Sequence, residues 1–293
     1  MTQALVADVG GTNTRIGFAG RDGVLMESVR RYRNDDFPDF ATLADGYLAG
    51  RDAAAFTVAI AGPVGAQSGR LTNRDWHFDA PDLGARFGIP NVTLLNDLAA
   101  LGHALPALPN SALLHVAEGQ PDGPQGLVIG LGTGFNVSPV HLAREVVFEA
   151  ETGHASLPSD VAVILRQEID PAPFPTVEDL FSGRGLKRLH VALGHADAPT
   201  EEIAKNEKTM ALMARALGAL TRSLAYLYMP LGGMFFNGSL ARALLNGSHT
   251  RTVLAPLQAD PIFDGCLARI PVRLLVDDAA ALHGCARQAA RLL

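Results

Sequence analysis

Short apolar runs alternate with helix-like stretches along the first hundred residues of the chain. Runs at 4–7 and 16–19 flank the segment Asp8-Val9-Gly10-Gly11-Thr12-Asn13-Thr14-Arg15, a pattern that predicts strand, tight turn and strand. Runs at 56–61 and 92–95 predict two more strands, and the second leads into a helix with Leu98, Leu101 and Leu105 on one face. Strands that alternate with helices in this way are typical of an α/β lobe.

The second half of the chain repeats the opening pattern. An apolar run at 127–131 leads into Gly132-Thr133-Gly134, and residues 135–142 return as a strand, which hints at internal duplication. The remaining pattern predicts helices over roughly 158–170, 176–194 and 201–228 and a strand with a turn over 234–239. A last strand over 272–276 precedes a closing Ala-rich helix, which we expect to pack on the first lobe.

Composition narrows the class of protein and its setting. With 293 residues, 48% hydrophobic and 18% charged, the chain suits a globular enzyme of two domains or lobes. A net charge of −6 without a basic tract argues against nucleic acid or an anionic membrane as a partner. Two cysteines, Cys266 and Cys285, argue against a disulfide framework or a Cys-based zinc site. Residues 210–236 predict an amphipathic helix and a strand rather than a membrane span, and the N-terminus, which runs straight into a strand, predicts a cytoplasmic protein.

The two Gly/Thr turns are candidate phosphate-binding turns. Glycine lets the backbone approach a ligand closely, and exposed N–H groups together with the Thr12 and Asn13 side chains can cradle a phosphate. Asp8, at the end of the first strand, can supply an oxygen to a Mg²⁺ shell. The first turn matches neither a P-loop nor a Rossmann turn. If both turns point into one cleft, one can hold the β-phosphate and the other the γ-phosphate, as phosphoryl transfer requires; the alternative is two ordinary hairpins.

Two polar groups are further candidates for chemistry. Asn96-Asp97 lies at a strand end and opens a helix, so Asp97 is either a helix cap, which spacing alone favours, or a general base toward a substrate hydroxyl. Glu151-Thr152-Gly153-His154 has metal-ligand spacing, but Gly153 makes a long helix improbable and no second Glu-x-x-His follows. A loop that hydrogen-bonds a polyol fits that segment better. Glu178 alone reads as a surface acid.

In this order, the motifs resemble those of the bacterial glucokinase family within the sugar kinase/actin/Hsp70 superfamily, nearly end to end. The matching segments are Asp8 to Arg15, Ile60-Ala61-Gly62-Pro63-Val64, Leu71-Thr72-Asn73-Arg74-Asp75-Trp76, Leu95-Asn96-Asp97-Leu98, Gly130-Leu131-Gly132-Thr133-Gly134, Glu151-Thr152-Gly153-His154, and Glu178 with Ser182-Gly183. The resemblance implies the α/β, two-lobed, actin-like (ribonuclease H-like) sugar kinase fold with its active-site cleft between the lobes. We expect a small lobe of residues 1–103 plus 278–293 and a large lobe of residues 104–277.

The resemblance also implies an activity and a site. It predicts ATP-dependent phosphorylation of D-glucose, or a similar hexose, to the 6-phosphate with Mg²⁺, in a protein that could be a homodimer. Asp97 would be the catalytic base, and Asn96, Asp97, Glu151, His154 and Glu178 would bind the sugar. Asp8 would bind Mg²⁺ through water. The nucleotide would contact Asp8, Gly10, Gly11, Thr12, Asn13, Gly132, Thr133, Gly134 and Gly238.

Three departures from the family pattern keep other functions open. Thr152 stands where the family has Gly, Phe135-Asn136 where it has Leu-Gly, and Asn237-Gly238-Ser239 where it has a Gly-Gly-Ile/Val type of adenosine motif. The first suggests a kinase for another hexose or an amino sugar as an alternative. The other two suggest a non-catalytic sugar sensor, and direct DNA binding is not expected because no helix-turn-helix precedes Asp8.

Overall fold

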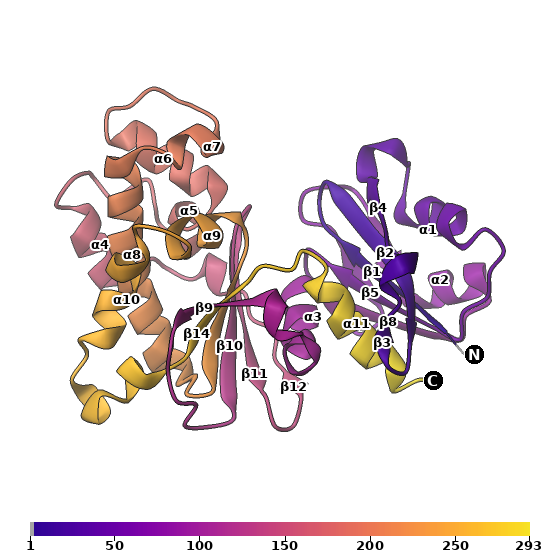
Figure 1. Ribbon diagram of the computed structural model, residues 1–293. Helices are drawn as coiled ribbons and strands as arrows, with labels where there is room; N and C mark the ends of the chain where they lie inside the picture. Colours follow the sequence, from indigo (N-terminus) through magenta and orange to yellow (C-terminus); the bar gives the residue numbers. More distant parts are fainter. Residues whose placement is uncertain (1–2) are drawn as a thin grey trace. The chain divides into compact units, whose positions relative to one another are not determined.

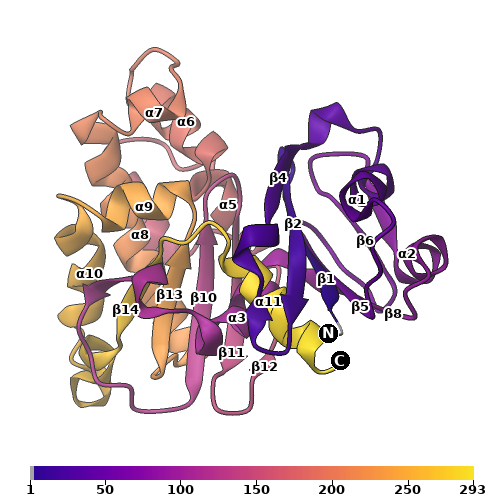
Figure 2. The same cartoon turned by 45° about the vertical axis from the view of Figure 1, so that its right-hand side comes forward.

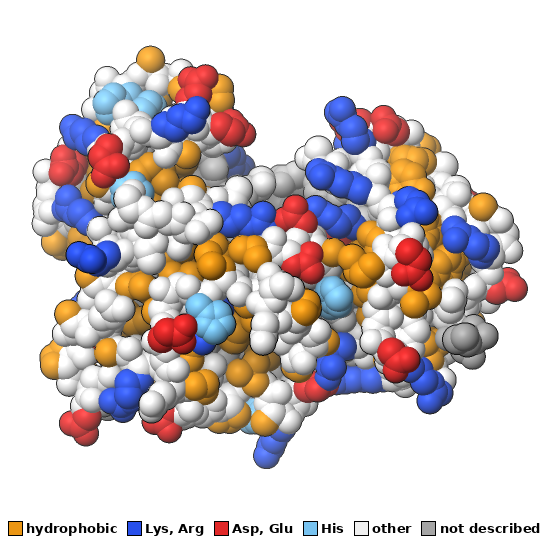
Figure 3. Space-filling view, in the orientation of Figure 1, with side chains coloured by type: hydrophobic (Ala, Val, Ile, Leu, Met, Phe, Trp, Pro, Cys, Tyr) orange, Lys and Arg blue, Asp and Glu red, His pale blue; other side chains and the backbone are white. Residues whose placement is uncertain are grey.

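A computed structural model describes residues 3–293 and divides the chain into two compact units (Figure 1). Unit 1 comprises Met1–Pro109 with Asp277–Leu293, and unit 2 comprises Asn110–Val276. The sequence placed the first boundary at 103/104 and the second at 277/278. Among the described residues, no helix is both long and apolar enough to cross a bilayer. Acidic and basic side chains are interspersed on the face of the molecule drawn in Figure 3.

Unit 1 is built on a mixed sheet with the strand order β3-β2-β1-β5-β8, with β4 paired to β2. β1 and β2 are antiparallel, whereas β1, β5 and β8 run parallel. The central strands are apolar because both faces are covered. The strands are β1 (Ala4–Val9), β2 (Asn13–Gly20), β3 (Gly23–Val24), β4 (Arg30–Arg33), β5 (Ala55–Ile60) and β8 (Asn91–Asn96), with a separate hairpin of β6 (Ser68–Arg70) and β7 (His77–Asp79).

Helices cover both faces of the unit 1 sheet. Helices α1 (Phe40–Leu48) and α2 (Ala80–Phe87) lie on one face, and α3 (Asp97–Ala104) and α11 (Ala280–Ala290) on the other (Figures 1 and 2). The closing helix α11 packs on α3 and β1, as the sequence predicted. The approach to α3 is so close that a Cβ at Gly284 would lie 1.8 Å from the carbonyl oxygen of Ala100. Only glycine permits that crossing without a shift of the helices.

Unit 2 is built on a second mixed sheet with the order β12-β11-β10-β13-β14-β9. Its strands are β9 (Leu113–Ala117), β10 (Gln125–Leu131), β11 (Phe135–His141), β12 (Val146–Val147), β13 (Gly233–Asn237) and β14 (Val272–Leu275). Its helices are α4 (Ser159–Leu165), α5 (Val177–Leu180), α6 (Gly183–Ala192), α7 (Thr200–Ile203), α8 (Glu207–Tyr228), α9 (Ser239–Leu245) and α10 (Thr250–Gln258). Helix α8 packs against α4, α6 and α10, and its apolar face joins the sheet in one core.

The two sheets repeat one pattern. In each sheet three consecutive strands pair antiparallel (β1-β2-β3 and β10-β11-β12). On its other side, the first of these strands pairs in parallel with a strand that in turn pairs with a second parallel strand (β5-β8 and β13-β14). The turns at Gly10–Thr12 and Gly132–Gly134 therefore occupy equivalent places. Each lies at the carboxyl edge of parallel strands, where ligands bind in open α/β sheets.

Two long predicted helices are each divided in the structure. The prediction over 176–194 becomes α5 and α6, because the Ser182 hydroxyl accepts from the Gly185 N–H and starts a new helix. The prediction over 201–228 becomes α7 and α8, because Asn206 caps the second helix at the Thr209 N–H. In both places a capping oxygen overrides an apolar periodicity that continues past it. Short 3₁₀ helices span Met26–Ser28, Asn34–Asp36, Leu105–Ala107, Asn110–Ala112, Thr152–His154 and Ile262–Arg269.

Candidate active-site residues

Unit 1 gathers its predicted site residues at one sheet edge. The three parallel strands end in register, with Val9 beside Ile60 and Ile60 beside Asn96. One strand therefore separates the first turn from Asn96-Asp97, a span of roughly 10 Å at the usual strand spacing. The local pattern of the sequence predicted each piece, and the parallel register brings them to the same edge.

The first turn is held by a residue that sequence reasoning missed. The Gly10 N–H donates to Asn13 O at 3.0 Å. The buried Asn34 side chain donates to Gly10 O at 2.7 Å and accepts from the Thr14 hydroxyl at 2.8 Å, and its own N–H donates to Thr12 O at 2.9 Å. Asn34 lies some twenty residues away, in the 3₁₀ helix after β4, so no local signal links it to the turn.

This bracing leaves donors at the tip of the first turn. Among the described residues, the N–H groups of Gly11 and Thr12 have no hydrogen-bond acceptor, and Thr12 is exposed. A turn with a fixed shape and free N–H groups is suited to bind an anion.

Asp8 faces Arg15 across the β1–β2 pair. Asp8 Oδ2 lies 3.4 Å from Arg15 Nη1, and Arg15 Nη2 lies 3.8 Å from Asp278 Oδ2 at the start of the closing segment. Burial raises the pKa of the Asp8 carboxyl, Arg15 opposes that effect, and Asp278 adds to it. The carboxylate is thus oriented by a cation at the strand end, although its ionisation is not favoured by its surroundings.

Asn96, not Asp97, caps α3. Asn96 Oδ1 accepts from the N–H groups of Leu98 at 3.0 Å and Ala99 at 3.4 Å, and its Nδ2 donates to Gly62 O at 3.1 Å. Asp97 is the first residue of the helix, where its Oδ1 accepts from the Leu98 N–H at 2.9 Å. The capping interpretation of Asp97 is therefore wrong by one residue, since β8 runs through Asn96 and the cap is the flanking position.

In unit 2, the second turn rests against β13. The Gly132 N–H donates to Gly134 O at 3.0 Å, and the Gly183 N–H donates to Gly132 O at 2.8 Å. Gly238 follows β13 with φ +108°, and a Cβ there would lie 2.3 Å from Leu131 O. That left-handed conformation and close approach require glycine, so Gly238 directly supports the second turn.

Glu178 and the Glu151 segment meet at the start of β11. Glu178 Oε2 accepts from the Phe135 N–H at 3.1 Å, directly after the second turn, and Oε1 accepts from Arg184 at 2.8 Å. The 3₁₀ helix Thr152–His154 presents Glu151 and His154 nearby, both exposed. Partial burial raises the pKa of Glu151; the nearby His154 lowers it and Glu178 raises it. Unit 2 thus assembles three predicted sugar-binding side chains beside its turn.

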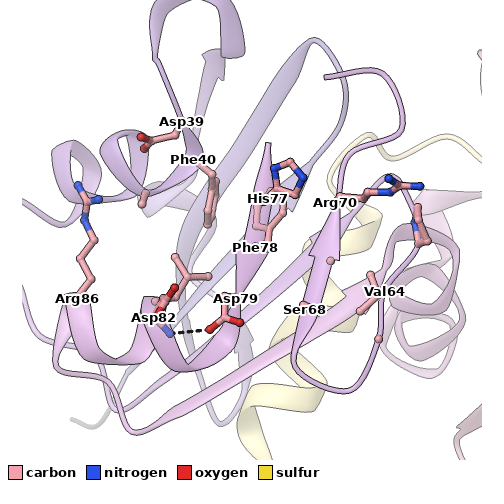
Figure 4. Close-up of a pocket in the computed structure, with 15 residues that line it drawn as sticks. Asp39, Phe40, Val64, Ser68, Arg70, His77, Phe78, Asp79, Asp82 and Arg86 are labelled. Atoms are coloured by element: carbon pink, nitrogen blue, oxygen red, sulfur yellow. Dashed lines mark hydrogen bonds between the residues drawn. The ribbon is translucent and has the colours of Figure 1, made fainter. Parts of the chain in front are cut away.

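Unit 1 also has a cavity that the sequence did not predict. It measures about 830 Å³ and lies between the β6–β7 hairpin and helices α1 and α2 (Figure 4). Val64, Arg70 and His77 line it on the hairpin side, and Asp79 and Arg86 on the side of α2. None of the predicted site residues lines it. Across the described residues, no three His, Cys, Asp or Glu side chains are grouped to hold a metal ion.

Two sheets that share the order of their five equivalent strands, each with a Gly/Thr turn at its carboxyl edge, are the arrangement of the two-lobed actin-like class to which sugar kinases belong. A family model described as Glucokinase matches residues 5–292. The chain belongs to the glucokinase family. Glucokinase from Chromobacterium violaceum is 31% identical over 96% of this chain and 88% of its own length. Glucokinase from Pectobacterium atrosepticum is 26% identical over 96% of this chain and 94% of its own length.

Solved structures agree with this assignment. The crystal structure of glucokinase from an Antarctic psychrotroph has a TM-score of 0.82 at 26% identity and covers 100% of this chain and 99% of its own. A ROK-family glucokinase from Streptomyces griseus, crystallised with glucose and AMPPNP, has a TM-score of 0.65 at 20% identity with 99% of each chain covered, a likeness that shows the fold alone. The predicted fold class is confirmed, while the roles of individual site residues stay predictions.

Proposed function

We propose that this chain transfers the γ-phosphoryl group of ATP to glucose and releases glucose 6-phosphate and ADP. The observation that carries the proposal is the pairing found at each sheet edge. In unit 1 a phosphate-type turn lies beside Asn96 and Asp97, and in unit 2 such a turn lies beside Glu151, His154 and Glu178. Family membership supports ATP and glucose as the substrates.

Asp97 is the proposed general base. Its place at the first turn of α3 fixes the carboxylate at the edge that carries the first turn. As the 6-hydroxyl oxygen of glucose bonds to the γ-phosphorus, its proton passes to Asp97 and the bond from the γ-phosphorus to the β,γ-bridging oxygen breaks. ADP leaves with that oxygen.

Four side chains are proposed to bind the remaining hydroxyls. Asn96 already uses Oδ1 for the cap and one amide hydrogen for Gly62, so it can offer its second amide hydrogen to the sugar. Glu151 and Glu178 accept from hydroxyl donors, and His154 presents a ring nitrogen. Once a bound sugar covers these groups, a sugar that lacks one hydroxyl would leave a polar atom unpaired, which is the basis of selectivity among sugars.

The proposed nucleotide site uses both turns and Gly238. In the first turn the N–H groups of Gly11 and Thr12, which have no acceptor among the described residues, would donate to phosphate oxygens. The second turn would supply backbone donors in the same way, and such a fixed arrangement stabilises charge as it develops. Asp8 fits a Mg²⁺ site, because a carboxylate held at a strand end by Arg15 can accept from a magnesium-bound water. Bound Mg²⁺ would neutralise charge on the phosphates.

A kinase for another hexose and a non-catalytic sensor are not favoured, because the relatives from Pectobacterium atrosepticum and Chromobacterium violaceum are glucokinases. A cytoplasmic location is proposed because ATP is supplied there, and a homodimer is proposed from the resemblance to the family. Coupled assays with glucose, mannose, fructose and glucosamine measure the sugar preference; a clear preference for a sugar other than glucose would contradict the proposal.

Replacement of Asp97 tests the catalytic assignment. We expect Asp97→Asn to lower glucose-dependent ADP formation by roughly 10²–10⁴-fold, the usual contribution of a general base. Asp75→Asn is the matched control, because Asp75 is a carboxylate of the same unit that is 98% exposed. The control is expected to keep activity within about twofold of the parent. Activity of Asp97→Asn within about tenfold of the parent would exclude the general-base role.

A further inference from the structure

One side chain of β11 bonds both peptide groups that flank Glu151. Asn136 Nδ2 donates to the carbonyl oxygen of Ala150 at 2.5 Å, and Asn136 Oδ1 accepts from the Thr152 N–H at 3.0 Å. The first bond holds the peptide that precedes Glu151 and the second holds the peptide that follows it. Because φ and ψ are the rotations between these two peptide planes, the Asn136 amide fixes the Glu151 backbone, found at φ −125° and ψ 53°.

The segment before Glu151 lies along the same face of β11. Ser138 is two residues from Asn136 and so projects from the same face, and its hydroxyl donates to Phe148 O at 2.7 Å. The Phe148 N–H donates to Pro139 O at 2.9 Å. These bonds anchor the approach to the Glu151 segment, whereas Asn136 alone among them contacts the peptides on either side of Glu151.

A second tie holds the segment from the other direction. Thr152 Oγ1 lies 3.1 Å from the hydroxyl oxygen of Tyr228, the last residue of α8. Thr152 and Asn136 are two of the positions where the sequence departs from the family pattern, and they bond each other. The side chain gained at 136 therefore stabilises the segment that carries the non-glycine residue at 152.

We propose that Asn136 is a positioning residue that orients Glu151 toward the sugar. This inference rests on the proposed function, since it assigns a use to the Glu151 carboxylate. Asn136 acts through the backbone of the sugar segment and not by contact with the reacting atoms. Loss of the bonds from Asn136 to Ala150 and Thr152 frees the Glu151 backbone. Sugar binding must then order that segment, and the entropy cost weakens the binding.

The test compares three variants of the full chain. Asn136→Ala is expected to raise the KM for glucose about tenfold, while kcat and the KM for ATP stay within about twofold, because the lost interaction serves sugar binding in the ground and transition states alike. Asn136→Asp keeps the acceptor for Thr152 but sets a carboxylate oxygen against the Ala150 carbonyl oxygen, so its KM for glucose should rise at least as much as that of Asn136→Ala. Ser138→Ala, the matched control, removes one bond to the same segment and is expected to change the KM for glucose less than about twofold.

The outcomes separate this inference from the function on which it rests. A KM for glucose that rises less than about twofold in Asn136→Ala, or equally in Ser138→Ala, overturns the positioning role. Hydrogen exchange gives a readout without activity: the Thr152 amide should exchange faster in Asn136→Ala and stay protected in Asn136→Asp. Unchanged exchange overturns the inference while the proposed function stands. A parent protein that forms no ADP with glucose overturns the proposed function, and the sugar role of Asn136 with it.

Discussion

Asn96→Ala tests whether Asn96, rather than its neighbour Asp97, holds the start of α3. The Asn96 side chain is 8% exposed and makes its three hydrogen bonds within unit 1. Loss of an Asn cap costs about 1 kcal/mol, and loss of the donor to Gly62 adds about 1 kcal/mol. Because Asp97 Oδ1 still accepts from the Leu98 N–H, no further penalty is expected. The free energy of unfolding should therefore fall by about 2 kcal/mol.

Trp76 allows that loss to be measured in unit 1. It is the single tryptophan of the chain, it is buried in the core of this unit, and its indole N–H donates to Pro38 O at 3.0 Å. Urea unfolding followed by tryptophan fluorescence therefore reports this unit, while far-ultraviolet circular dichroism reports both units. A change in the urea midpoint at constant slope gives the difference in stability.

Two control variants decide the interpretation of the Asn96→Ala measurement. Asp97→Ala, which removes the proposed base, should lower the unfolding free energy by less than about 1 kcal/mol, the usual contribution of an acidic residue in the first turn of a helix. Asn96→Asp keeps the capping acceptor but sets a carboxylate oxygen against the Gly62 carbonyl oxygen, so at least about 1 kcal/mol of the destabilisation should remain. If Asp97→Ala destabilises as much as Asn96→Ala, or if Asn96→Ala costs less than about 0.5 kcal/mol, the capping assignment is refuted.

Two further predictions concern unit 1 and use the same fluorescence of Trp76. Gly284→Ala should lower the unfolding free energy by about 2 kcal/mol or more, since the new Cβ meets the Ala100 carbonyl oxygen at 1.8 Å; equal or higher stability would contradict the helix crossing. For Asp8→Asn the sign follows from the raised pKa of Asp8. The folded protein holds the Asp8 proton more tightly than the unfolded chain, whose Asp8 has the ordinary pKa of 3.8. The free energy of unfolding therefore falls as the pH rises from 3.8 through the raised pKa of the folded state. We therefore expect Asp8→Asn to be more stable than the parent at pH 7, with the difference vanishing in acid; a less stable variant at pH 7 would show that the pairing with Arg15 dominates.

The sequence predicted what is encoded locally. Both Gly/Thr turns follow apolar runs and precede returning strands, so the period of the pattern and the glycines were sufficient to place them. Parallel strands end at a common edge, and this rule explains why Asn96 lies near the first turn. Cap positions were less accessible: Ser182 and Asn206 interrupt helices whose apolar pattern continues past them. The assignment of the α3 cap to Asp97 instead of Asn96 is a boundary error of one residue.

The sequence could not predict contacts made across the fold. Asn34 braces the first turn from the end of β4, and nothing in the intervening residues links it to Gly10. Asn136 was recognised as a departure from the family pattern, but its bonds to Ala150 and Thr152 depend on how the segment after β12 returns along β11. Such side-chain bonds join residues far apart in sequence, and they form only once the sheet has set the register.

The equivalent edges of the two sheets hold their turns by different means. In unit 1 the buried side chain of Asn34 braces the turn and has no proposed role in sugar binding. The proposed sugar-binding residues Asn96 and Asp97 are separate from that brace. In unit 2 one carboxylate, that of Glu178, accepts from the Phe135 N–H at the end of the turn. The same side chain is a proposed sugar ligand. The repeated sheet pattern determines where each turn lies. Whether a turn is coupled to sugar binding depends on the side chain that braces it, and on whether that side chain also contacts the sugar. On the proposed roles that link would lie in unit 2, where Asn136 also bonds the peptide groups on both sides of Glu151.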